Sequence, residues 1–196
     1  MLKNREITTR GVVIARAQSG EGSVRVFIYT DELGLVGAFA KSGREERSKL
    51  RPHLQIGTHG TYTLVKGRHE WRIVGVVDTE NILFILADRP HARQAAARVM
   101  SVVRQLIHGE EVNRELFHAL GGFFAVLPDC SPKEARISER LAMVRILASL
   151  GYVPTLSDIP HLSDFSFERE VLLHLAPFEA RMTKAINDAL LASGLS

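Results

Sequence analysis

Residues 22–40 read GSVRVFIYTDELGLVGAFA, and this stretch decides the fold. In its first half, apolar side chains recur at every second position from Val24 to Ile28, with Arg25 among the residues between them. A period of two is typical of a half-buried strand. Asp31-Glu32 then interrupts the pattern, and a second short apolar run follows. The stretch therefore predicts two consecutive strands joined by a short turn.

The same period extends over the first part of the chain and predicts five strands. Their expected ranges are Thr8–Ala17, Gly22–Thr30, Leu35–Ala40, Thr61–Lys66 and Glu70–Val77. Five short antiparallel strands are too few for a sandwich, and closing into a small barrel removes their exposed edges. An SH3-like barrel fits the strand count nearly as well. The long connection between the third and fourth strands favours an OB-type barrel.

After Asp78 the apolar period becomes helical, which predicts an all-α domain. A first helix is entered through Asp88 and Pro90, and a second starts at Asn113 and ends at Pro128. The third helix has a capping box at Ser131–Glu134 and closes at Gly151, and further helix is expected over 166–192 with a break at Pro177. The predicted fold class is α+β, with a barrel domain over 1–79 and a helical domain over 80–196.

Composition and charge narrow the function classes. The chain has 196 residues, 45% hydrophobic and 24% charged, as in ordinary soluble globular proteins. The single cysteine and the lack of an apolar leader favour the cytoplasm, with no membrane segment. Residues 1–80 hold thirteen Lys and Arg against nine Asp and Glu, whereas residues 81–196 hold twelve against thirteen. This asymmetry predicts a polyanion partner for the barrel domain.

Motifs for catalysis are missing from the sequence. No Walker lysine follows a glycine loop, and Gly20-Glu21-Gly22 lacks the third glycine of a dinucleotide fingerprint. Cys130 is best explained as a chance small residue at a helix start. The eight histidines lack the close spacings that chelate zinc. We therefore expect no enzymatic activity, no cofactor and no bound metal.

A basic connector lies between the third and fourth predicted strands, over residues 41–51. It holds five cations in eleven residues, namely Lys41, Arg44, Arg47, Lys49 and Arg51. Such side chains neutralise phosphates and release condensed counterions, and the serines beside them donate hydrogen bonds to the same oxygens. A solvated surface loop is the alternative, because Glu45-Glu46 offsets part of the charge. In the context of a small barrel we favour nucleic-acid binding.

Aromatic residues on the predicted strands allow two interpretations. Phe27, Tyr29, Phe39 and Trp71 lie on strands that also carry Arg25 and Arg72, a mixture that stacks bases in single-strand binders. A small barrel also needs large side chains inside it. Core packing is the stronger expectation for any one of them, and base stacking is the alternative.

Three motifs follow one another along the chain. The first comprises Glu21, Tyr29–Gly34, Ala40–Arg44, Ser48–Pro52 and Leu54-Gln55. The second is Asn113–Phe117 with Leu120, and the third runs from Arg140-Leu141 to Gly151–Pro154. Each motif is weak alone, but their order and spacing make coincidence improbable. In these motifs the chain resembles the bacterial recombination mediator family RecO.

The resemblance implies a DNA repair protein that works without ATP. Such a protein binds single- and double-stranded DNA, anneals strands coated by single-strand-binding protein and cooperates with RecR to load RecA. In this chain the helical domain would dock RecR and the C-terminal tail of single-strand-binding protein, in the cytoplasm at the nucleoid. By position, the five cations of the basic connector match the loop implicated in DNA contact, with Arg10 and Arg25 as additions from the barrel.

Departures from the family pattern carry their own expectations. Many relatives hold a four-cysteine zinc ribbon after the Gly-Tyr-x-Pro element, whereas 155–165 has no cysteine here, so we expect no zinc and a loop held by packing. The glutamates in the basic connector should weaken phosphate binding, and the short chain suggests trimmed partner-contacting helices. Two other hypotheses remain: an RNA-binding OB protein of translation, and a protein-interaction scaffold.

Overall fold

The chain divides into two compact units in a computed structural model. The barrel unit comprises Met1–Ile85 with Ile107–Val112, and the helical unit comprises Leu86–Leu106 with Asn113–Ser196. The structure describes residues 6–19, 23–41, 48–68, 70–153, 159–162, 164 and 166–194. The domain limits expected from the sequence, 1–79 and 80–196, stay a prediction.

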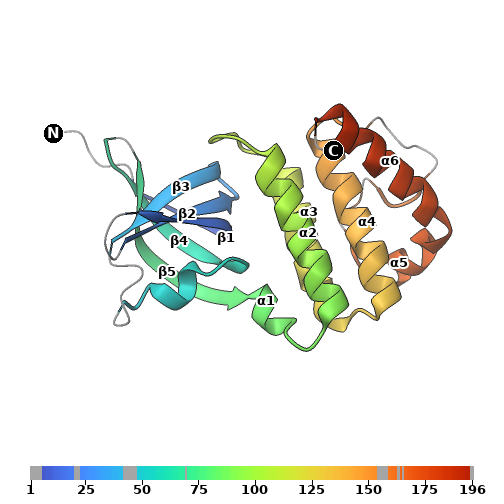
Figure 1. Cartoon of the computed structure of the whole chain (residues 1–196), viewed down its shortest axis with the longest axis horizontal. Helices are drawn as coiled ribbons and strands as arrows, with labels where there is room; N and C mark the ends of the chain where they lie inside the picture. Colours follow the sequence, from blue (N-terminus) through green and yellow to red (C-terminus); the bar gives the residue numbers. More distant parts are fainter. Residues whose placement is uncertain are drawn as a thin grey trace. The chain divides into compact units, whose positions relative to one another are not determined.

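In the residues that the structure describes, five strands and two short helices build the barrel unit (Figure 1). Their bounds are β1 Glu6–Ser19, β2 Ser23–Thr30, β3 Gly34–Ala40, η1 Arg51–Leu54, β4 Thr58–Lys66, β5 Trp71–Asn81 and α1 Ile82–Ile85. The strands form a closed barrel in the order β1-β2-β3-β5-β4. Five strands followed by helices are therefore confirmed, and the arrangement is consistent with an OB-like domain.

One strand pairing contradicts the all-antiparallel prediction. β3 and β5 run parallel, with Ala38 opposite Trp71 and Phe39 opposite Arg72, whereas the other four pairings are antiparallel. The reason is parity. Strand directions cannot alternate all the way around a ring with an odd number of strands, so at least one neighbouring pair must be parallel.

The barrel core is built from the inward positions of these strands. Val24, Val26 and Ile28 of β2 point inward with Val36 and Ala38 of β3, and all are at most 2% exposed. Tyr29 and Trp71 are also buried, at 0% and 3% exposure, so packing is the correct interpretation for these two aromatics. Phe27 and Phe39 stay half-buried. The aromatic set therefore divides between packing and surface.

The segment Ile107–Val112 returns to the barrel unit between two helices. The Leu35 N–H donates to the Gly109 carbonyl at 3.2 Å. Gly34 has a φ of +68°, and a Cβ added there would lie 2.1 Å from the Glu111 carbonyl oxygen. The β2–β3 turn therefore requires glycine twice over, for its backbone conformation and for the close approach of this segment.

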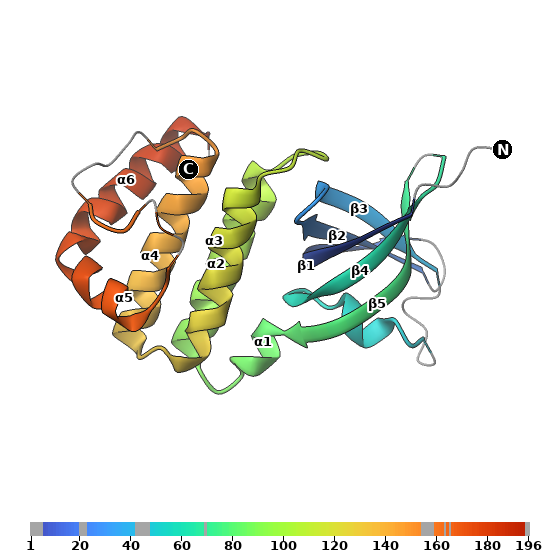
Figure 2. The ribbon, with the colours of Figure 1, turned by 180° about the vertical axis from the view of Figure 1, so that it is seen from behind.

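The helical unit is built from α-helices and short 3₁₀ turns (Figures 1 and 2). The helices are α2 Pro90–Leu106, α3 Arg114–Val126, α4 Pro132–Ser149, α5 Arg169–Leu175 and α6 Glu179–Ala192, and the turns are η2 Leu127–Asp129 and η3 Ala176–Phe178. α4 contacts the other four α-helices of this unit and is buried on most sides. It begins with the predicted capping box, in which Ser131 and Glu134 each accept from the other's backbone N–H.

A buried arginine holds the loop that follows α4. Arg145 donates to the carbonyls of His161 and Ser166 at 2.6 and 3.0 Å, and to the Asp164 carboxylate at 3.1 Å. Its guanidinium lies 4.7 Å from the centre of the Phe167 ring. Burial lowers the pKa of Arg145 to about 10, so it stays charged at neutral pH. Packing alone, as the sequence suggested, is therefore only part of what holds this loop.

Substitution at Gly34 tests the packing of the returning segment. Gly34→Ala should lower the free energy of unfolding by about 3 kcal/mol, because left-handed backbone strain adds to a clash with the Glu111 backbone. Gly109→Ala is the matched control, since Gly109 also has positive φ but no atom lies within 4 Å of an added Cβ. It should cost about 1 kcal/mol. Equal losses in urea unfolding would contradict the packing.

Candidate nucleic-acid interface

Three strands align a cation, an aromatic ring and a second cation on the outside of the barrel. Arg25 of β2 lies opposite Phe39 of β3, and Phe39 lies opposite Arg72 of β5. Directly paired residues project to the same face of a sheet. Their neighbours Val24, Ala40 and Ile73 are buried inside, so this row projects outward.

Apolar side chains surround the row. Phe27 lies opposite Gly37, and a Cβ added at Gly37 would be 3.6 Å from both the Phe27 ring and the Arg25 Nε. These two side chains therefore lean over a glycine. Val74, two residues after Arg72, is 56% exposed. We define the outer face as the outward residues of β2, β3 and β5, which are Arg25, Phe27, Leu35, Gly37, Phe39, Arg72 and Val74.

This composition suits a single-stranded nucleic acid. Half-buried aromatic rings offer flat apolar surfaces on which bases stack, and the flanking guanidiniums reach the phosphates or stack on bases themselves. The outward side of a small barrel is otherwise expected to be polar, because only the inner side needs apolar residues. An apolar strip bordered by arginines is therefore a candidate ligand surface.

The two outer-face arginines differ in their ion pairs. Arg25 donates to the Glu70 carboxylate at 3.2 Å, with side chains 45% and 38% exposed. A pair this exposed contributes little stability, so a phosphate can replace the carboxylate at small cost. Arg72 is exposed, and no carboxylate within the described ranges forms an ion pair with it. Arg72 therefore keeps its charge available for a polyanion.

Arg10 lies elsewhere on the barrel. It pairs with Asp31 at 2.7 Å, just past the end of β2, whereas Arg25 is near the start of that strand. Six residues of extended chain separate Arg25 from Asp31, or about 20 Å. The structure therefore does not bring Arg10 and Arg25 together.

Of the basic connector, the structure describes the two ends. Lys41 directly follows β3, beside the start of β2, and is exposed. Lys49 and Arg51 are described at the entry to η1, and Arg51 is exposed. Arg44 and Arg47 lie outside the described residues. The roles assigned to these five cations stay a prediction.

A polar cluster that the sequence did not predict lies beside the row. Glu110, from the returning segment, accepts from Lys66 Nζ at 2.6 Å and from the Trp71 indole N–H at 2.9 Å. Lys66 Nζ also lies 4.6 Å from the centre of the Trp71 ring. Hydrogen bonds from Lys66 and Trp71 lower the pKa of Glu110. The cluster ties the β4–β5 hairpin to the segment that packs on β3.

Cys130, the single cysteine, is unsuited to nucleophilic catalysis. Cys130 is buried, and burial raises the pKa of its thiol to about 11, so it is protonated and a poor nucleophile at neutral pH. Among the residues that the structure describes, no cluster of histidine, cysteine and carboxylate side chains could hold a metal ion. No helix in the same ranges is long and apolar enough to cross a membrane.

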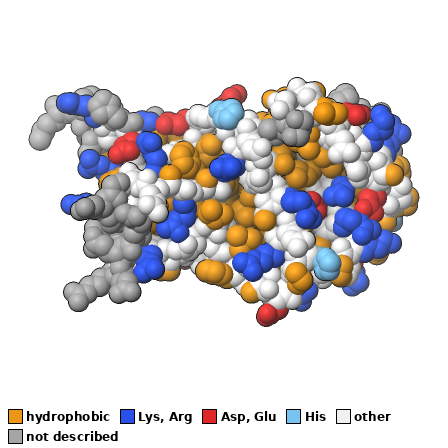
Figure 3. Space-filling model, viewed as in Figure 1, with side chains coloured by type: hydrophobic (Ala, Val, Ile, Leu, Met, Phe, Trp, Pro, Cys, Tyr) orange, Lys and Arg blue, Asp and Glu red, His pale blue; other side chains and the backbone are white. Residues whose placement is uncertain are grey.

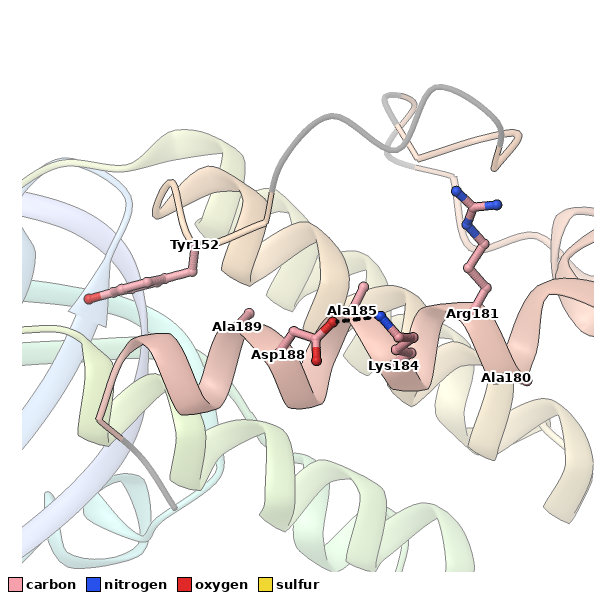
Figure 4. Close-up of a pocket in the computed structure, with 7 residues that line it drawn as sticks. All are labelled: Tyr152, Ala180, Arg181, Lys184, Ala185, Asp188 and Ala189. Atoms are coloured by element: carbon pink, nitrogen blue, oxygen red, sulfur yellow. Dashed lines mark hydrogen bonds and ion pairs between the residues drawn. The ribbon is translucent and has the colours of Figure 1, made fainter.

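The helical unit contains a groove beside α6, with a volume of about 630 Å³ (Figure 4). Alanines supply its apolar part, while Tyr152 and Arg181 lie toward opposite ends. Lys184 forms an ion pair with Asp188 at 3.2 Å along its rim. Two cations and one carboxylate thus border an apolar hollow. The remaining lining residues are Ala180, Ala185 and Ala189.

The architecture defines a class: a closed, mixed five-stranded barrel of OB-like type, with a cation-bordered outer face and an appended helical unit. Residues 2–77 match the family model described as "Recombination protein O N terminal". The family resemblance drawn from the sequence motifs is thereby confirmed, and the match covers residues 2–77.

Curated proteins that match most of this chain carry the same family name. The "DNA repair protein RecO" of Dehalococcoides mccartyi (strain ATCC BAA-2266 / KCTC 15142 / 195) is 25% identical over 161 residues, covering 81% of this chain and 61% of the relative. The protein of the same name from Chlorobium limicola is 25% identical over 153 residues, covering 76% of this chain and 58% of the relative. The chain thus spans about three fifths of the length of these relatives.

Trp71, the single tryptophan, allows the Glu110 cluster to be tested by fluorescence. Since the folded pKa of Glu110 is lowered, its contribution to stability is full above the ordinary pKa and is lost as pH falls through the folded value. We expect a change in Trp71 emission below pH 4.5, the ordinary value for glutamate. Glu110→Gln should abolish this change. An unaltered acid transition in that variant would contradict the cluster.

Proposed function

We propose that this chain is a non-enzymatic DNA-binding protein of repair and homologous recombination that holds single-stranded DNA on the outer face. The observation that carries the proposal is the row of Arg25, Phe39 and Arg72 across three strands. It places one guanidinium on each side of the half-buried Phe39 ring. Bases would stack on Phe39 while the arginines and the basic connector contact phosphates.

The charge distribution of the chain and its similarity to DNA repair proteins support this proposal. The barrel half carries the chain's excess of cations, as residues 1–80 hold thirteen Lys and Arg against nine Asp and Glu. Relatives that cover most of this chain are named for DNA repair. In the full proposal the protein also binds duplex DNA, anneals strands coated by single-strand-binding protein, and with RecR assists RecA loading in the cytoplasm at the nucleoid. Contacts to phosphates and rings do not depend on base sequence, which suits annealing.

The groove beside α6 suits the acidic and apolar tail of single-strand-binding protein. Its alanines would accept apolar side chains, while Arg181 and Lys184 would pair with carboxylates. Ala185→Glu places a like charge in the groove and should weaken binding of a tail peptide about tenfold. Asn187→Glu, exposed on the same helix and outside the groove lining, is the control. Equal binding by both variants would remove the groove from the proposal.

Salt dependence tests the outer face. A complex driven by phosphate contacts loses affinity log-linearly with salt, with a slope of about 0.7 per contacted phosphate on single strands. Arg25→Gln with Arg72→Gln should reduce the slope by about one to two units. Arg114→Gln with Lys133→Gln removes the same charge from exposed positions of the helical unit and should leave the slope unchanged.

Phe39→Ala separates stacking from charge in the same titration. It should weaken binding by about 1–3 kcal/mol with the salt slope intact. An unchanged slope in the double arginine variant would contradict the proposal. A strong preference for RNA with no annealing would favour the RNA-binding hypothesis, and a wild-type chain without any salt-dependent binding would favour a scaffold.

A further inference from the structure

Helix α2 carries charge of one sign. Its seventeen residues include three arginines and no aspartate or glutamate. The helix lies toward the viewer in Figure 1, and Figure 3 shows Lys and Arg side chains over the helical unit on that side. None of the cations assigned to DNA contact so far lies on this helix. Its composition therefore calls for an explanation of its own.

The two faces of α2 are sharply divided. One face packs into the helical unit through Ala92, Ala95, Ala96, Val99, Met100 and Val103. The other is exposed and consists of Pro90, His91, Arg93, Gln94, Ala97, Arg98, Ser101, Arg104 and Gln105. Each polar residue on the exposed face can donate a hydrogen bond. The exposed face of α2, defined by these residues, is thus a surface of hydrogen-bond donors with small residues among them.

Ion pairing leaves two of its arginines available. Arg98 is held by the buried Glu139 through two hydrogen bonds of 2.6 and 2.7 Å, so its charge is already compensated. Arg93 and Arg104 are exposed, and in the part of the chain that the structure describes no carboxylate pairs with either. Eleven residues of helix place them about 16 Å apart along one side of α2.

We propose that the exposed face of α2 is a second nucleic-acid contact surface, which binds the sugar-phosphate chain of a second strand. Arg93 and Arg104 contact separate phosphates, while Gln94, Ser101 and Gln105 donate to phosphate and sugar oxygens between them. The small side chains of Ala97 and Ser101 let the strand approach the helix. This inference rests on the proposed function and extends it from one strand to two.

A nucleic acid fits this surface better than an acidic protein segment. Protein partners obtain most of their affinity from apolar or aromatic anchors seated in hollows. The groove lining of the helical unit comes from Tyr152 and α6, and includes no residue of α2. A phosphate chain needs only spaced cations and hydrogen-bond donors, which the exposed face of α2 supplies.

A second surface gives annealing a physical basis. A chain that holds one strand on the barrel and another on α2 turns their encounter into an intramolecular event at high effective concentration. Because the exposed face of α2 contacts the sugar-phosphate chain, the bases of the second strand remain free to pair. Losing the exposed face of α2 should therefore slow annealing while one strand stays bound to the barrel.

The test counts strands per chain. The full chain is mixed with two non-complementary oligonucleotides, one carrying a donor dye and the other an acceptor dye. Each is about eight nucleotides long, which is within the site size of one barrel. Wild type should bind two strands and give energy transfer. Arg93→Gln with Arg104→Gln should bind one strand, lose the transfer, and anneal complementary strands about tenfold more slowly. Arg114→Gln with Lys133→Gln, which removes equal charge away from α2, should behave as wild type.

The outcomes separate the two proposals. One strand per wild-type chain, or two strands on the α2 variant, would overturn the second surface. If Arg25→Gln with Arg72→Gln loses a strand while the α2 variant loses none, the outer face is supported as a binding surface and the α2 surface is refuted. A wild-type chain that binds no strand removes both proposals. A polyglutamate peptide that binds wild type but not the α2 variant, while both strands stay bound, would assign the exposed face of α2 to an acidic protein and refute a nucleic acid there.

Discussion

The closure between β3 and β5 is the constraint on which the rest of the barrel unit depends. A ring of five strands must contain a parallel pair, and here that pair is short, with two residue pairs in register. The returning segment Ile107–Val112 adds to it, because Gly109 accepts from the Leu35 N–H and Glu110 holds Lys66 and Trp71. Without this closure β2, β3 and β5 would not form one continuous surface.

The same closure creates the candidate interface. Arg25 and Phe39 are joined by the antiparallel β2–β3 hairpin, but only the parallel pairing brings Arg72 beside Phe39. Trp71, one residue earlier, points inward, so a single strand supplies both a core residue and a surface cation. The stability of the barrel and the geometry of the interface therefore depend on the same few residues.

Local signals predicted much of this structure. Period-two alternation located the strands, and the Ser131 capping box and the Asn113 N-cap located helix starts, since these depend on residues close in sequence. The parallel pairing, the return of Ile107–Val112 and the contacts of Arg145 join residues far apart in sequence, which no local pattern encodes. For each aromatic the sequence favoured core packing over base stacking, but the assignment of Trp71 to the core required the register.

The site shows the same division. The sequence predicted the connector cations, with Arg10 and Arg25 of the barrel, as phosphate ligands, but it gave no means of knowing that Arg10 lies at the far end of β2. The glutamates that offset the barrel cations were also missed, because Glu70 and Glu110 meet Arg25 and Lys66 only in the folded chain. Among the site features that were not predicted, the charge pattern of α2 is the one visible in the sequence, as a helix with three arginines and no carboxylate.

The most direct measurement of the central claim is photocrosslinking of the full chain to a single-stranded oligonucleotide that carries 5-iododeoxyuridine, followed by mass-spectrometric mapping of the linked residues. Stacking on the outer face predicts crosslinks at Phe39 and Phe27, and their loss in the Phe39→Ala and Arg72→Gln double variant. Crosslinks confined to the helical unit, with β2, β3 and β5 unmodified at saturating oligonucleotide, would contradict the account.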